Sequence, residues 1–202
     1  MGFGEQVINI TSWDQLVVIV HELGHCLGLL HEHQRHDRDP FILVNDDNMQ
    51  SGFEGQLDLM PFSNVQGPYD FDSVVHYDRC AFSMCCPGGA TCNCAPNCQT
   101  ITVLPPNQAF QNTIGQRDHL SYLDGTIMSL LYPEDDTVFF ALGGGPGNGS
   151  LSSPHNEFQL SLVPAEGTAV LLNGGTYINE SGITIDQAMT IKAPLGGALF
   201  GE

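Results

Sequence analysis

The stretch HELGHCLGLLHEHQRHDRD, which begins at His21, contains the residue types most able to do chemistry in this sequence. His21 and His25 are four residues apart, so on a helix both imidazoles point to one side and can bind a single metal ion. Glu22 lies one position further round, close enough to hold a water molecule against that metal. Gly28 can end the helix in a left-handed conformation, after which the chain can turn and bring back His31 as a third ligand.

This spacing predicts a catalytic zinc site. Three neutral histidines leave one position open on a tetrahedral zinc ion, unlike the closed four-ligand sites that serve structure. Zinc lowers the pKa of its water to about 7, and a neighbouring carboxylate, here Glu22, can act as general base. A bare H-E-x-x-H occurs by chance in many helices, but H-E-x-x-H-x-x-G-x-x-H requires ligands, base and turn glycine to coincide. We therefore expect zinc ligands rather than surface histidines at His21, His25 and His31.

Two further histidines, His33 and His36, follow in a polar run. Their spacing has no ligand geometry, and we expect both to be solvated on the surface. From His31 the motif continues as H-E-x-x-R-x-D-R-D and ends at Asp39. This continuation resembles the astacin branch of the metzincin zinc proteases.

The resemblance to astacins implies a zinc endopeptidase with one zinc ion per chain, the three histidines as its ligands and Glu22 as its base. In that family the glutamate that matches Glu32 lies below the site and helps to anchor the mature N-terminus. The charged run from Arg35 to Asp39 forms internal ion pairs in the family, whereas an ordinary loop of this composition would be solvated.

A second stretch, YDFDSVVHYDRCAFS from Tyr69 to Ser83, resembles the astacin segment that passes under the zinc. There the family's tyrosine is a fifth metal ligand that swings to the transition-state oxyanion, and Tyr77 matches it. A phenol suits this role because it donates a hydrogen bond when neutral and binds a metal when ionised. Val75 replaces the family's methionine, so we expect slight underpacking below the histidines. His76 would be structural, and Arg79 is a candidate for the pocket that receives the residue after the scissile bond.

A third block, GQRDHLSYLD, begins at Gly115 and matches the run that opens the family's C-terminal helix. Ser121 and Asp124 fit the start of that helix, which should run through Leu131. The match covers roughly residues 4 to 134, and its three blocks keep the family's order. It implies an α+β, metzincin-type fold with a zinc helix and a C-terminal subdomain.

Few residues precede the zinc-binding stretch. A capping-box pattern at Ser12 and Gln15 opens an expected helix from Trp13 to Leu27, and alternation over Gln6 to Ile10 favours a short strand. Astacin-like domains carry most of a twisted sheet ahead of this helix, but only 20 residues precede His21 here. We therefore expect that sheet to be largely missing. The apolar stripe that it would cover should then be exposed; its members are Leu16, Val20, Leu23 and Leu27.

Composition and charge exclude several classes of protein. The chain has 202 residues, of which 42% are hydrophobic, enough for a folded core. Five Lys and Arg against 23 Asp and Glu give a net charge of −18, which repels nucleic acid and anionic membranes. The sequence contains no run of about 18 apolar residues, so we predict no membrane span. We expect a protein or peptide substrate and no nucleic-acid partner.

Six of the seven cysteines crowd between Cys80 and Cys98. An even, dense set in a Gly/Pro-rich loop predicts disulfides, an oxidising compartment and therefore a secreted protein. Fifteen pairings are possible, and the sequence does not choose among them. The alternative is a second zinc bound by thiolates, since Cys92, Cys94 and Cys98 have tolerable spacing. Cys26 is expected to be a buried free thiol.

The character of the chain changes after residue 134. The glycine-rich GGGPGNGS at 143–150 indicates a boundary, so we predict a protease domain over 1–134, a linker over 135–150 and a second domain over 151–202. Short apolar segments there suggest the opening coils of a right-handed parallel β-helix, with a small β-sandwich as the alternative. Such a module would bind a glycan, a surface or a partner. Because the chain stops at Glu202, short of about three coils, we expect the module to be truncated.

Two hypotheses of function follow. The leading one is a secreted zinc endopeptidase in which Glu22 deprotonates the attacking water and Tyr77 stabilises the oxyanion. The other is a catalytically silent, zinc-binding adhesion module, which Val75 and the short N-terminal part favour. The complete set of ligands, base and tyrosine favours the protease, because a silent module would have no need to keep it.

Overall fold

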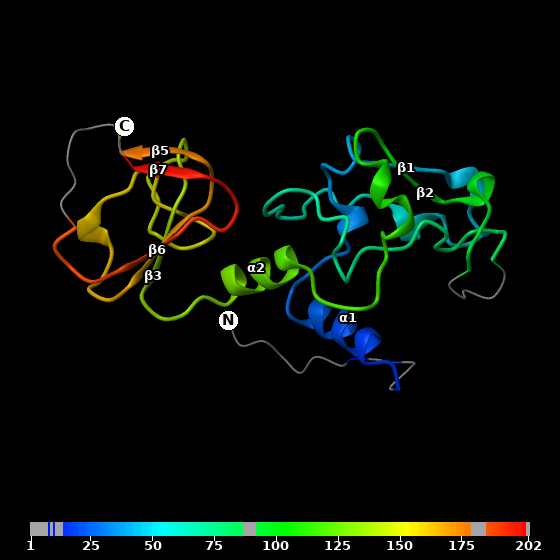
Figure 1. Cartoon of the computed structure of the whole chain (residues 1–202), viewed down its shortest axis with the longest axis horizontal. Coiled ribbons are helices and arrows are strands. Elements are labelled where there is room, and N and C mark those ends of the chain that lie inside the picture. The colour runs from blue at the N-terminus through cyan, green and yellow to red at the C-terminus, as the bar shows by residue number, and fades with distance from the viewer. Residues whose placement is uncertain (1–7, 9, 11–13, 87–91, 179–184, 201–202) are drawn as a thin grey trace. The chain divides into compact units, whose positions relative to one another are not determined.

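The computed structural model describes residues 8, 10, 14–86, 92–178 and 185–200. The chain divides into two compact units, Met1–Met128 and Ser129–Glu202, and Figure 1 labels both α-helices and most of the strands. Ser12 and most of the strand expected over Gln6–Ile10 lie outside the described residues; Ile8 and Ile10, which are described, are not in a strand. No described helix has the length and apolar character needed to cross a membrane. Helices and strands are mixed, as expected for an α+β fold.

Helix α1 spans Leu16–Cys26 and is shorter at both ends than the sequence predicts. Its N-cap residue, Gln15, makes no side-chain capping hydrogen bond. After the helix, Gly28 has a φ of 101°, the left-handed conformation expected of a residue that ends the helix and turns the chain.

The leucine stripe of α1 is exposed. Leu16 is 72% exposed, Leu23 42% and Leu27 40%. The buried face instead carries His21 and Gly24. A Cβ on Gly24 would lie 3.3 Å from Cδ1 of Leu29 and 3.5 Å from a methyl group of Val75, so both side chains pack against this face of the helix.

The rest of the first unit is built mainly from loops and short elements around a small sheet. Strands β1 (Ile42–Val44) and β2 (Ile101–Val103) pair antiparallel, with Ile42 opposite Val103. Their buried side chains join a hydrophobic cluster that includes Tyr69 and Phe71. Single turns of 3₁₀ helix connect these parts, at Glu32–Gln34, Asp46–Asn48, Glu54–Leu57, Pro96–Cys98 and Gln108–Asn112.

Helix α2 spans Tyr122–Leu131, and the predicted start and end are confirmed. Ser121 Oγ accepts a hydrogen bond from the Asp124 N–H at 2.8 Å, and Asp124 Oδ2 accepts one from the Ser121 N–H at 3.0 Å. This is a reciprocal cap. The same carboxylate accepts hydrogen bonds from Ser73 Oγ at 2.7 Å and from the Val74 N–H at 2.8 Å. One side chain therefore begins the helix and also holds a distant turn.

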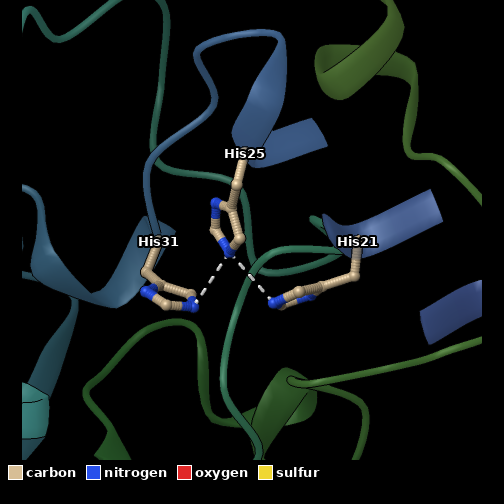
Figure 2. A group of neighbouring side chains, drawn as sticks. All are labelled: His21, His25 and His31. Atoms are coloured by element: carbon tan, nitrogen blue, oxygen red, sulfur yellow. Dashed lines mark hydrogen bonds between the residues drawn. The ribbon is translucent and has the colours of Figure 1, made fainter. Parts of the chain in front are cut away.

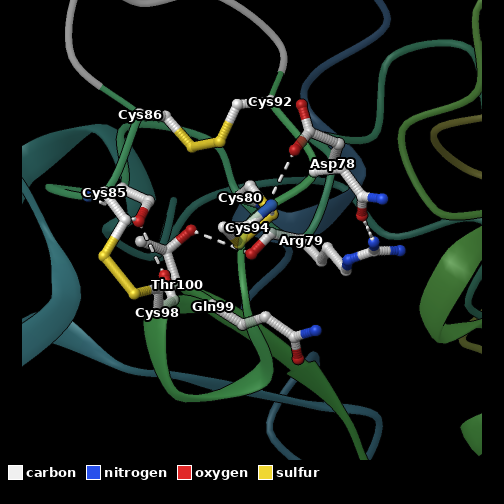
Figure 3. The surroundings of a disulfide bond; sticks show 12 residues. Asp78, Arg79, Cys80, Cys85, Cys86, Cys92, Cys94, Cys98, Gln99 and Thr100 are labelled. Carbon is white, nitrogen blue, oxygen red and sulfur yellow. Dashed lines mark hydrogen bonds between the residues drawn. A yellow bond between two sulfur atoms is a disulfide. The ribbon is translucent and has the colours of Figure 1, made fainter.

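The cysteine-rich loop is disulfide-bonded, as predicted (Figure 3). With all six of its cysteines paired, the loop has no free thiolate for a second zinc, so the disulfide interpretation replaces the thiolate alternative. Cys26 is free and half-buried. The three bonds are Cys80–Cys94, Cys85–Cys98 and Cys86–Cys92.

The second unit contains two parallel sheets. The first has the order β3 (Thr137–Phe140), β4 (Thr168–Leu171), β6 (Thr190–Lys192). The second pairs β5 (Gly175–Ile178) with β7 (Ala198–Phe200). Strand β3 lies within the range predicted as linker and belongs to the first sheet. The domain boundaries drawn from the sequence remain a prediction.

Gly115 offers a test of how closely its segment packs against the backbone of Asp78. Its φ is +76°, and a Cβ there would lie 2.3 Å from the backbone nitrogen of Asp78. We expect Gly115→Ala to lower the free energy of unfolding by about 3 kcal/mol, measured by denaturant titration. The control is Gly125→Ala in α2, where a Cβ meets nothing within 4 Å. It should be neutral, or stabilising by up to about 1 kcal/mol. Equal effects of the two substitutions would contradict this view of the packing.

Candidate metal centre

Three histidines point their ring nitrogens at one another (Figure 2). His21 and His25 come from α1, and His31 returns to them after the turn at Gly28. The Nε2 atom of His25 lies 3.1 Å from that of His21 and 3.2 Å from that of His31. The structure thus brings together the three residues that the sequence predicts as ligands.

The opposite nitrogen of each ring is held by an acceptor. Nδ1 of His21 lies 2.8 Å from the Val74 carbonyl, and Nδ1 of His25 lies 2.8 Å from the Leu29 carbonyl. A carbonyl only accepts hydrogen bonds, so both Nδ1 atoms carry the hydrogen and both Nε2 atoms present a lone pair. Nδ1 of His31 is 3.0 Å from Oε1 of Gln34, which accepts in the same way.

This arrangement fits a zinc ion. Two Nε2 lone pairs cannot hydrogen-bond to each other, so the contacts of His25 with His21 and His31 at about 3 Å need a cation between the nitrogens. Tetrahedral zinc with Zn–N bonds of about 2.0–2.1 Å requires nitrogens roughly 3.3 Å apart, close to the separations here. Burial lowers the pKa of His21, and it lowers the pKa of His31 to about 3. Both rings are therefore neutral at pH 7, as metal ligands must be.

Tyr77 lies against this cluster. Its ring centroid is 4.4 Å from that of His31, and burial raises the pKa of its hydroxyl. Glu22 is half-buried on α1, and its charge acts on both Tyr77 and His21. The base and the tyrosine predicted from the sequence thus lie in the surroundings of the three imidazoles.

Arg117 is a residue that reasoning from the sequence missed. Its Nη1 donates hydrogen bonds to the carbonyls of Val74 and His76, both at 3.0 Å. The Val74 carbonyl also accepts from His21, so the guanidinium supports the backbone that orients this histidine. Its place in the GQR block, next to the start of the C-terminal helix, is the signal that the sequence offers.

The prediction for His33 is wrong. This side chain is 0% exposed, and its ring stacks on Tyr77 with centroids 4.2 Å apart. Burial also holds its pKa well below the ordinary value, so it is neutral. The error arose because a polar sequence context says nothing about which segments fold over it; the 3₁₀ turn that ends at Leu57 does so here. His36 is exposed, as predicted.

The charged run forms internal ion pairs, as the resemblance implies. Glu32 Oε1 accepts hydrogen bonds from Arg35 Nη1 at 2.8 Å and from the Asp70 N–H at 2.7 Å. Arg35 also binds both carboxylate oxygens of Asp37, at 2.9 Å. Burial raises the pKa of Glu32 to about 7. Its expected contact with the mature N-terminus stays a prediction.

The residues below and beside the three histidines are buried or hydrogen-bonded to other groups of the chain. Val75 is 2% exposed. His76 donates from Nδ1 to the Tyr77 carbonyl at 2.6 Å and accepts from the Tyr69 hydroxyl at 2.8 Å, so its contacts are structural. Arg79 lies beside the disulfides (Figure 3). Its guanidinium donates hydrogen bonds to the side-chain oxygens of Asn93 and Asn112. Its role in a substrate pocket stays a prediction.

Several known proteins are similar to this chain. A family model described as "Astacin", a peptidase family, matches residues 1–133. Tolloid-like protein 2 of Mus musculus is 33% identical over 186 residues, covering 85% of this chain and 17% of its own. Bone morphogenetic protein 1 of Xenopus laevis is 34% identical over 218 residues, and the match covers 100% of this chain and 29% of the relative's length. Zinc metalloproteinase nas-14 of Caenorhabditis elegans is 36% identical over 118 residues, and the match covers 57% of this chain and 20% of the relative's length.

A solved structure is also similar: the high choriolytic enzyme 1 of Oryzias latipes, described as a hatching enzyme zinc-protease. It is 35% identical, with a TM-score of 0.47, and covers 57% of this chain and 52% of its own. The chain spans less than a third of the length of the tolloid-like and bone morphogenetic relatives.

This chain belongs to the astacin family of peptidases. The resemblance seen in the zinc-binding stretch is therefore confirmed.

The buried His76 predicts a pH effect on stability. Burial lowers its pKa from 6.5 to about 4. Above pH 6.5 neither state carries the proton, and this contribution is fully present. As the pH falls from 6.5 to 4, the unfolded chain binds a proton that the folded chain does not, so folding weakens by about 1.4 kcal/mol per pH unit. Denaturant titrations of the metal-free protein at several pH values give the free energy of unfolding as a function of pH. The slope of this free energy against pH should be shallower in His76→Gln than in wild type, by the equivalent of up to one proton. Identical slopes would contradict this prediction.

Proposed function

We propose that this chain is a secreted, zinc-dependent endopeptidase that hydrolyses peptide bonds in protein or peptide substrates. The observation that carries the proposal is the convergence of three Nε2 lone pairs, from His21, His25 and His31, with each Nδ1 held by an acceptor. These three histidines would hold the metal. An all-nitrogen set with an open fourth position is typical of catalytic zinc.

Bound there, zinc would supply Lewis acidity that polarises the scissile carbonyl and acidifies a water molecule. Glu22 follows the first ligand on the same helix. Its carboxylate takes the proton of the attacking water and later returns it to the leaving amine. The half-buried position of Glu22 supports this role, because a carboxylate there is shielded but still reachable by substrate.

Tyr77 acts on the developing oxyanion. Its ring lies beside His31, and its hydroxyl, kept protonated by a raised pKa, is a hydrogen-bond donor at neutral pH. A donor that meets the oxyanion and not the ground-state carbonyl lowers the barrier without tightening substrate binding.

The second domain is proposed to form coils of a parallel β-helix that bind a glycan or a surface. Register supports this: Thr168 of β4 pairs with Thr190 of β6, and Gly175 of β5 pairs with Ala198 of β7, so strands recur in parallel after 22 and 23 residues. Successive coils of a solenoid stack in this way. Secretion is supported by the three disulfides, which persist in oxidising compartments.

Glu22→Gln separates metal binding from catalysis. We expect zinc content near wild type and a peptidase rate lowered by at least about a hundredfold, because the amide cannot accept the water proton. Casein hydrolysis and metal analysis measure the two effects. Glu54→Gln, at an exposed glutamate, is the matched control and should keep full activity. Unchanged turnover in metal-replete Glu22→Gln would reject the assignment of the base.

Tyr77→Phe removes one hydroxyl and tests the oxyanion role. Folding and zinc content should persist while kcat falls more than KM rises, because the lost contact exists only in the transition state. Steady-state kinetics on a peptide substrate measure this. Tyr122→Phe, at a tyrosine that is 75% exposed, is the control. A change confined to KM would make Tyr77 a substrate contact instead.

A further inference from the structure

The ring of Tyr77 rests on a buried imidazole. The rings of His33 and Tyr77 are 4.2 Å apart between centroids and 25° from parallel, which is a stacked pair. On the same tyrosine, His31 is tilted by 55°. The proposed oxyanion group therefore has a flat contact with one histidine and an angled contact with a proposed zinc ligand.

The main chain of Tyr77 is held by imidazoles on both sides. Its N–H donates to Nδ1 of His33 at a long 3.4 Å, and its carbonyl accepts from Nδ1 of His76 at 2.6 Å. The Tyr69 hydroxyl in turn donates to Nε2 of His76 at 2.8 Å. Because both backbone groups are bonded, most of the freedom left to this tyrosine lies in its side chain.

His33 is itself firmly placed. Its side chain is 0% exposed, and its Nε2 lies 3.4 Å from the Gln56 carbonyl, to which it donates. Its own carbonyl accepts a hydrogen bond of 2.6 Å from Nη1 of Arg38, a buried guanidinium. A residue bonded through ring and backbone can serve as a rigid surface for a neighbouring ring.

We propose that His33 is a positioning residue that sets the plane of the Tyr77 ring beside His31. A stacked ring can slide along its partner with little loss of contact, whereas tilting away from it breaks the contact. The hydroxyl of Tyr77 is thus confined to one plane as it moves toward the reacting carbonyl. This inference rests on the proposed function, because it acts through the hydroxyl of Tyr77.

The kinetic test is a double-mutant cycle in the full chain. His33→Leu removes the flat face, and we expect kcat to fall about tenfold with KM within about twofold. His33→Phe keeps a ring in the same space and should recover most of that loss. In the Tyr77→Phe background, His33→Leu should cause no further loss, because the hydroxyl through which it acts is already absent. An equal loss in both backgrounds would overturn the proposal.

A second measurement needs no activity and no metal. In the chelated protein with ¹³C-labelled tyrosines, the Tyr77 ring signals can be identified from their absence in Tyr77→Phe. We expect these signals to be displaced by the stacked imidazole, to move in His33→Leu and to stay displaced in His33→Phe. His36→Leu, at the exposed histidine of the same segment, should leave them unchanged.

The two measurements separate the inference from the function on which it rests. Tyr77 ring signals that do not respond to His33→Leu, or that lose their displacement in His33→Phe, would overturn the positioning role. If His33→Leu does not fold, the comparison of wild type with His33→Phe still decides. Unchanged kcat in Tyr77→Phe would instead reject the oxyanion role, whatever the ring signals show.

Discussion

The Nε2 atom of His25 lies 3.1 Å from that of His21 and 3.2 Å from that of His31, and nitrogen lone pairs that face each other at such distances repel unless a cation lies between them. The constraint acts through the far side of each ring. Carbonyl oxygens of Val74 and Leu29 and the side chain of Gln34 accept hydrogen bonds from the three Nδ1 atoms. These contacts determine tautomer and orientation before any metal binds. The proposed zinc site is thus preorganised by two backbone carbonyls and one glutamine side chain.

The turn that contains Val74 links parts of the chain that are far apart in sequence. Its carbonyl accepts from His21 and from Arg117, while its N–H donates to Asp124 at the start of α2. The three sequence blocks that suggested the family therefore meet at one residue. Beyond the turn, Gly115 lets its segment approach Asp78 closely, next to Tyr77. Replacing any of these partners should alter the orientation of the proposed zinc ligands, although none of the partners contacts the metal.

Local patterns predicted much of this. The spacing of His21 and His25 on one helix face, the turn at Gly28 and the cap of α2 depend on residues close in sequence, and all were found as expected. What failed or stayed open depends on distant segments. The sequence around His33 predicts a polar surface, but in the folded chain a remote 3₁₀ turn and a tyrosine 44 residues away cover this histidine. The disulfide partners and the contacts of Arg117 likewise require the folded backbone, which the sequence pattern does not specify.

The most direct test of the central claim is X-ray absorption at the zinc K-edge on the full chain loaded with one equivalent of zinc. The facing Nε2 atoms of His21, His25 and His31 predict nitrogen or oxygen scatterers at about 2.0–2.1 Å, a three-imidazole signature in the outer shells and no sulfur. Substituting His31 by alanine should remove one imidazole from that signature. A sulfur shell near 2.3 Å, or zinc that fails to bind stoichiometrically, would contradict the account.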